Sequence, residues 1–172
     1  LGRASLAMWD WYNLTGDQDA FYVGTKLNEF LREYQPMWAN PNPSRFPNEG
    51  AGQYFGHIHS YLQAAHGFLG EARALVKNNP NDPIAQQDIQ RAKDMYEFTK
   101  TRTRGYVVGN FCEADCVDNM IRIGIRLTEL GAGNYYDEIE YWVTNELAEK
   151  QIDAPTAINY IGNNTTDSYS TD

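Results

Sequence analysis

The chain has 172 residues, of which 42% are hydrophobic, 13% aromatic and 22% charged, with a formal net charge of −9 at pH 7. This length is enough for one domain with a sizeable core, here expected to span residues 1–172. The negative charge argues against a nucleic-acid or anionic-membrane partner, because either partner requires clustered Lys and Arg. The sequence has no run of 18 apolar residues and predicts no membrane span.

Hydrophobic periodicity predicts an all-α fold of six helices in three pairs, each an inner helix followed by an outer one. The expected helices cover residues 2–14, 18–34, 57–78, 82–99, 112–130 and 135–147. The first helix is apolar on several sides, which is typical of a helix buried all round. The second member of each pair carries a single apolar stripe. The repeated pattern indicates a solenoid or a closed ring of helical hairpins.

The connections alternate in length, which argues against a regular tetratricopeptide-like array with uniformly short turns. Turns within a pair are short, whereas residues 35–56, 100–112 and 152–172 form long segments, here expected to be rim loops. If the inner helices run parallel, every long link returns the chain to the same rim. Arg3, His57, His59 and the 112–116 cluster are therefore expected around one mouth, at helix N-termini.

Two histidines, His57 and His59, stand where the second inner helix begins. Imidazoles at these positions either bind a sugar or act as acid and base near neutral pH. The alternative is structural, with His57 capping the helix and His59 satisfied in the core. His66, which lies mid-helix among apolar residues, is expected to be structural.

The third inner helix opens with Glu113, Asp115 and Cys116, a set that suits zinc once an imidazole joins it. The alternative is that the thiol is a small buried hydrophobe and the acids are ordinary first-turn residues favoured by the helix dipole. Further along the same helix, Arg122 and Arg126 either pair with acids of a neighbouring helix or line the inside of the ring.

Aromatic side chains in the long links offer flat faces on which sugar rings stack, or else pack the links against the rim. The residues expected to bind substrate are Arg3, Trp38, Tyr54, Phe55 and Tyr106.

The run Glu113-Ala-Asp-Cys-Val-Asp-Asn-Met-Ile-Arg, the turn that begins at Gly131 and the motif Gly56-His-Ile-His-Ser resemble six-hairpin (α/α)6 toroid carbohydrate-active enzymes. The similarity is closest to the β-L-arabinofuranosidase-like group. It implies a toroid whose rim forms the active site, glycoside cleavage as the activity, and zinc bound by a Glu and a Cys. In this chain Glu113 matches the Glu, but Asp115 stands where the Cys is expected, and no later cysteine pair occurs.

The resemblance implies a glycoside hydrolase-like protein that acts on or binds a glycan or polysaccharide, with Glu113, His57 and His59 as catalytic candidates. Two alternatives remain: a non-catalytic helical-repeat module of an extracellular assembly, and a polysaccharide lyase. Three hairpins make half of a six-hairpin ring, so the chain is expected either to be a fragment or to close with another subunit. Sequons at Asn13, Asn163 and Asn164 favour an extracytoplasmic or secreted location.

Overall fold

The computed structural model describes residues 1–34, 58–100 and 114–148, and these residues are almost entirely helical. The helices are α1 (Gly2–Thr15), α2 (Gln18–Tyr34), α3 (Ile58–Val76), α4 (Pro83–Lys100), α5 (Ala114–Glu129) and α6 (Tyr136–Trp142), and α6 continues into a π-helical turn, η1 (Val143–Leu147). Within the described ranges the expectation of an all-α chain with six helices is confirmed. No helix in these ranges is both long and apolar enough to cross a membrane.

Local sequence signals explain where the helices begin and end. Gly16 closes α1 in a left-handed conformation (φ 76°), and its backbone N–H donates to the Tyr12 carbonyl. Glycine is the residue that adopts this conformation at least cost. The Asp17 carboxylate then accepts two backbone N–H groups in the first turn of α2. Asp82 caps α4 in the same way, with Pro83 in the first helical position.

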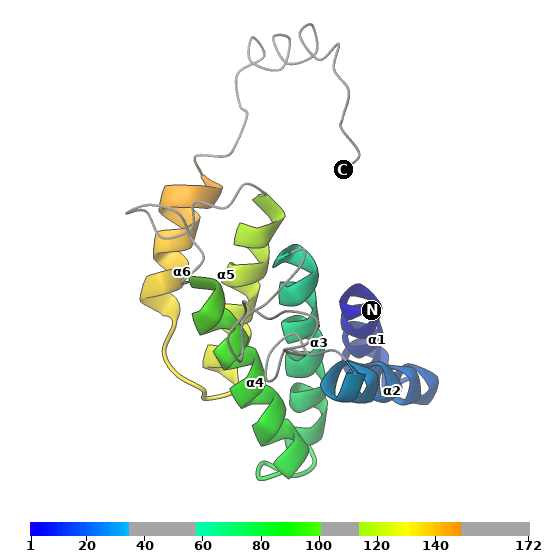
Figure 1. Ribbon diagram of the computed structural model, residues 1–172. Helices are drawn as coiled ribbons and strands as arrows, with labels where there is room; N and C mark the ends of the chain where they lie inside the picture. The colour runs from blue at the N-terminus through cyan, green and yellow to red at the C-terminus, as the bar shows by residue number, and fades with distance from the viewer. Residues whose placement is uncertain (35–57, 101–113, 149–172) are drawn as a thin grey trace, which may run out of the picture.

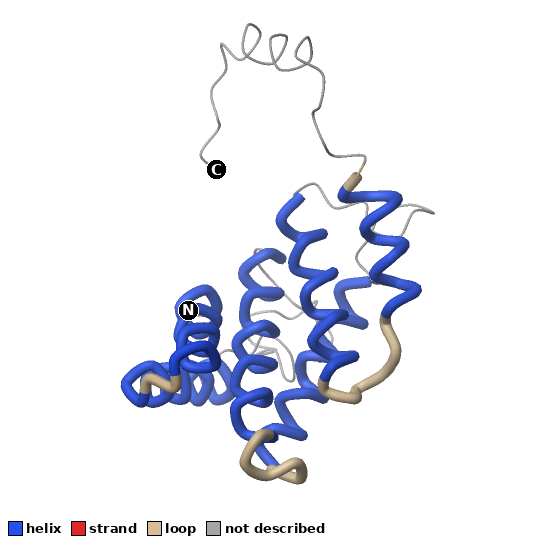
Figure 2. Tube along the Cα trace, turned by 180° about the vertical axis from the view of Figure 1, so that it is seen from behind, coloured by secondary structure: helices blue, strands red, loops and turns tan. Residues whose placement is uncertain are grey.

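The helices form three successive pairs, with α3 and α4 between the other two pairs, and the α1–α2 pair is inclined to the four helices α3 to α6 (Figure 1). Near the helix starts, Arg3 of α1 contacts His59 of α3. Near the helix ends, Asn13 of α1 donates to the Gly70 carbonyl of α3. Helices α1 and α3 therefore run in the same general direction, and so does α5. Figure 2 shows the same order from behind, with the α3–α4 and α5–α6 turns at one end of the molecule.

Helix α1 is not buried all round, so that expectation is wrong. Its buried residues, Gly2, Ser5, Leu6 and Trp9, face its neighbours, whereas Trp11 and other apolar side chains are exposed. The reason is position: among the described helices, α1 lies at the edge of the array and packs mainly against α2 and α3. Apolar periodicity indicates that a face is suited to burial, and it does not indicate that a neighbour is present to bury it.

Close approach between α1 and α3 depends on glycine. A Cβ atom built on Gly67 would lie 2.9 Å from the Ser5 Cβ, and one built on Gly70 would lie 2.5 Å from the Trp9 Cβ. The Trp9 ring is completely buried and meets Phe21 edge to face at 5.3 Å. These contacts fix how α1 is placed against the central helix, and so where its first turn lies.

A buried ionic network holds α2, α3 and α4 together, and sequence patterning did not reveal it. Arg32 of α2 donates to Glu71 of α3 (3.1 Å) and to Asp88 of α4 (2.6 Å), and Arg91 donates to Asp88 (3.2 Å). Asn28 donates to Glu71 at 2.6 Å. Both carboxylates are buried. Burial, reinforced by the nearby Glu71 charge, raises the pKa of Asp88 to about 7 against the opposing pull of Arg32 and Arg91.

Candidate functional site

Three polar side chains from three different helices meet at one end of the array. Arg3, His59 and Asp115 lie in the first described turns of α1, α3 and α5 respectively. Because α3 packs against both α1 and α5 and its His59 contacts residues of both helices, the starts of the three helices lie at the same end. The expectation that Arg3, His59 and part of the 112–116 cluster come together is confirmed for Arg3, His59, Asp115 and Cys116.

His59 is the centre of this cluster, and both of its ring nitrogens are engaged. Arg3 Nη2 lies 2.6 Å from His59 Nε2, and Gln63 Nε2 lies 3.4 Å from the same nitrogen. On the other side, Nδ1 lies 3.2 Å from Asp115 Oδ2 and 3.0 Å from Asn119 Nδ2. The imidazole therefore connects the guanidinium of α1 to the carboxylate of α5.

The contacts determine which ring nitrogen carries the hydrogen. A guanidinium only donates hydrogen bonds, so His59 Nε2 must accept from Arg3. The hydrogen of a neutral ring is then on Nδ1, where it donates to Asp115 Oδ2, and the Asn119 amide, which is also a donor, makes its hydrogen bond to the Asp115 backbone carbonyl and not to Nδ1. The result is a directed chain of hydrogen bonds from Arg3 through His59 to Asp115.

His59 and Asp115 differ in how far their side chains are buried. The His59 side chain is 4% exposed, while the Asp115 side chain is 52% exposed. A ligand in the mouth can therefore reach the carboxylate, whereas the ring lies behind it and orients it. Asn119, one turn further along α5, donates to the Asp115 backbone carbonyl at 2.5 Å and fixes the same turn.

A second imidazole, His66, lies deeper between α3 and α5. Both of its ring nitrogens and the Asn119 Oδ1 are buried without a hydrogen-bond partner among the described residues. Burial, reinforced by the charges of Arg126 and Arg122, lowers the pKa of His66 to about 3. The ring is therefore neutral over the physiological pH range, in agreement with its expected structural role.

The zinc hypothesis can be tested against the donor set. His59, Asp115 and Cys116 each offer one ligand atom, and these atoms all lie within 4.8 Å of one another. Nitrogen, oxygen and sulfur together suit zinc. A metal-bound imidazole, however, donates its other N–H to an acceptor, and here Nε2 faces the Arg3 guanidinium, which is a donor. As arranged, the cluster is a hydrogen-bonded acid and imidazole and does not fit zinc.

The charged stripe of α5 pairs with α1. Arg126 Nη2 donates to Asp10 Oδ1 at 2.7 Å, and Arg122 Nη2 lies 4.0 Å from Asp10 Oδ2. Of the two interpretations of this stripe, pairing with an acid of another helix is the one observed. The pairing ties α5 to α1 across the face of α3.

Several candidates from the sequence lie outside the described residues. These are His57, Glu113, Trp38, Tyr54, Phe55 and Tyr106, together with the expected rim loops. Their assignments remain predictions.

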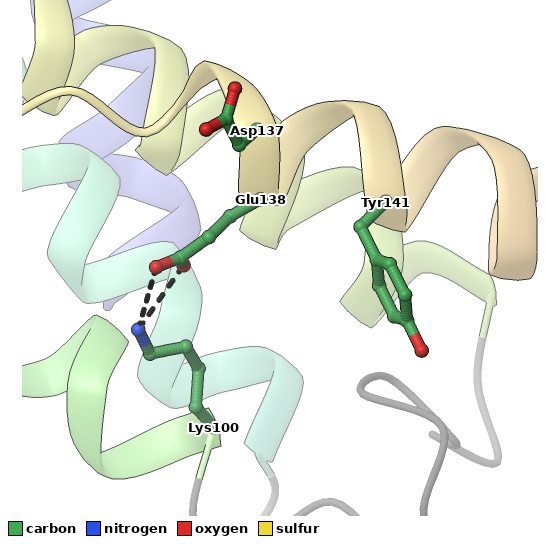
Figure 3. A pocket seen from close by; sticks show the side chains of 4 residues that line it. All are labelled: Lys100, Asp137, Glu138 and Tyr141. Atoms are coloured by element: carbon green, nitrogen blue, oxygen red, sulfur yellow. Dashed lines mark hydrogen bonds and ion pairs between the residues drawn. The ribbon is translucent and has the colours of Figure 1, made fainter.

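The structure also contains a pocket that the sequence did not predict. It measures about 470 Å³ and is lined by Lys100, Asp137, Glu138 and Tyr141. Figure 3 shows Glu138 and Tyr141 projecting from one side of α6, with Lys100 reaching Glu138 from the end of α4. Glu138 also accepts from the Tyr96 hydroxyl at 3.0 Å. The sequence gives no signal for the pair of Lys100 and Glu138, because the two residues belong to different hairpins.

Comparisons of this chain with protein-family models, curated proteins and solved structures found no match.

Proposed function

We propose that the protein is carbohydrate-active and belongs to a six-hairpin (α/α) toroid of the glycoside hydrolase-like type, with a glycan bound at the shared mouth of the inner helices. The observation that carries the proposal is the convergence of Arg3, His59 and Asp115 from the first described turns of α1, α3 and α5. A half-exposed carboxylate held by a buried imidazole suits an acid, a base or a hydrogen-bond acceptor for sugar hydroxyls.

In this proposal Asp115 contacts the glycan and His59 positions it. Glycoside cleavage requires two carboxylates on either side of the scissile bond. Glu113, two residues before Asp115 and matched to a functional Glu by the resemblance, is the proposed second carboxylate. The loop aromatics Trp38 and Tyr106 are proposed to stack on sugar rings.

The experiment is a glycan-binding and turnover panel, with polysaccharides and aryl glycosides, comparing the natural chain with Asp115→Asn. Asp118→Asn is a matched control, because Asp118 lies one turn away on α5 with a similar exposed fraction of 53%. We expect Asp115→Asn to weaken glycan binding or turnover at least about tenfold, the loss of a charge-assisted hydrogen bond, while Asp118→Asn leaves both unchanged.

Equal losses in the two variants, or none in either, would refute the assignment of Asp115. The product distinguishes the chemistries. A free reducing sugar indicates hydrolysis, whereas an unsaturated sugar indicates β-elimination by a lyase. Binding by the natural chain without turnover indicates a glycan-binding module.

A further inference from the structure

A second cavity lies between the last turns of α3 and α5, at the end of these helices opposite to His59 and Asp115. Its volume is about 340 Å³, which lies near the lower limit of the range for small-molecule sites. Its floor is apolar: Leu69 is completely buried, and Val76 and Leu130 are partly buried and pack against the core. A floor of this kind suits a ring or a short apolar chain.

Three cations among the described residues surround this floor. Arg73 and Lys77 come from the end of α3, and Arg126 comes from the last turn of α5. Glu129 is the one acid among the described lining residues. The cavity is therefore positively charged, although the chain as a whole carries a net charge of −9.

Arg126 is held in place by a carboxylate, whereas the other two cations are not. Arg126 Nη2 donates to Asp10 Oδ1 of α1 at 2.7 Å, and the Arg126 side chain is only 16% exposed. Lys77 Nζ lies 3.4 Å from the oxygen of the neutral Asn13 amide. Within the described ranges neither Arg73 nor Lys77 forms an ion pair with a carboxylate, so two positive charges of the cavity have no counterion there.

Arg73 and Lys77 are four residues apart on α3, so their like charges repel each other. An anion between them removes this repulsion. A guanidinium binds an oxyanion through two parallel N–H groups, and an ammonium adds a point charge. Helix C-termini favour nearby cations by themselves, but that preference does not require the cations to share an apolar cavity.

We propose that this cavity binds a small organic anion, whose apolar body rests on the leucine and valine floor and whose carboxylate or phosphate group lies among the three cations. Burial of the apolar body supplies affinity that a bare ion does not obtain. The charge of the head group selects against neutral ligands. The inference does not depend on the glycan proposal, because no residue of the cavity belongs to the cluster around His59.

The test is calorimetric titration of the natural chain with four probes. Benzoate and phenyl phosphate carry both a ring and a charge, phenol carries the ring alone, and inorganic phosphate carries the charge alone. We expect benzoate or phenyl phosphate to bind at least about tenfold more tightly than phenol and inorganic phosphate, and the tighter of the two identifies the head group. Equal affinity for phenol or inorganic phosphate would overturn the proposal, as would the absence of binding by both charged aromatics.

Substitutions locate the bound probe. Arg73→Gln and Lys77→Gln should each weaken binding of the tighter probe about fivefold, because each removes a charged hydrogen-bond donor. Lys26→Gln, which removes the same charge from an exposed position on α2, is the matched control and should leave the affinity unchanged. Equal losses in all three variants would show a general effect of net charge, and no loss in Arg73→Gln and Lys77→Gln would place the anion elsewhere; either result contradicts the proposal.

Glu129→Gln gives a result that a folding defect does not imitate. The change removes the acid from the cavity, so it should tighten binding of the anionic probe about threefold. Unchanged or weaker binding in Glu129→Gln would show that the anion does not lie in this cavity.

Discussion

Replacing Asp88 with Asn tests the buried ionic network between α2, α3 and α4. The Asp88 carboxyl is completely buried, and its pKa is raised from an ordinary value of 3.8 to about 7, chiefly by burial. A group whose pKa is higher in the folded chain stabilises the fold fully at low pH. That stabilisation is lost as the pH rises from about 4 through about 7, because the unfolded chain releases the proton first.

The size of the effect follows from the two pKa values. A rise from 3.8 to about 7 corresponds to about 4 kcal/mol of unfolding free energy lost across this range. Asn resembles the protonated acid and does not titrate. Asp88→Asn should therefore match the natural chain near pH 4 and exceed its stability progressively, by up to about 4 kcal/mol, above pH 7.

The assay is urea unfolding at half-unit intervals between pH 4 and pH 8, read as the difference between variant and natural chain. Taking the difference cancels the titration of groups that do not interact with Asp88, including His66, whose contribution has the opposite sign. Asp94→Asn, which removes an exposed carboxylate from the same helix, is the control and should show no such trend. A constant difference between Asp88→Asn and the natural chain at pH 5 and pH 8 would show that the Asp88 carboxyl is not protonated in the fold.

Three further substitutions test the packing and the site. His66→Leu removes a buried ring whose pKa is lowered to about 3. The unfolded chain protonates this ring below about pH 6.5, whereas the folded chain keeps it neutral down to about pH 3, so the natural chain loses stability as the pH falls. The variant should therefore gain about 3 kcal/mol more at pH 4.5 than at pH 7.5, measured by urea unfolding. Gly67→Ala places a Cβ 2.9 Å from the Ser5 Cβ and should lower the unfolding free energy by about 1 to 3 kcal/mol; no loss would mean that α1 is free to shift. Arg3→Met removes the donor that faces His59 Nε2, so calorimetry should show zinc binding at least about tenfold tighter than in the natural chain, and equal affinity would show that Arg3 does not control the ring.

Much of the fold was predictable because its signals are local. Gly16, Asp82 and Pro83 mark helix ends through backbone conformation and capping, which depend on neighbouring residues alone. The meeting of His59 with Asp115 was also predictable, although the two are far apart in sequence. Short turns within pairs and long links between them make the inner helices parallel, and parallel helices bring their first turns together.

The remaining features depend on which hairpins are neighbours. From the sequence, Asp88 is an ordinary acid on an outer helix. Only the packing of α2 and α4 against α3 buries it next to Arg32. The pocket at Lys100 and Glu138 likewise joins α4 to α6. The exposed face of α1 was predicted to be buried because its residues are suited to burial, but none of the described helices covers Trp11 or Leu14.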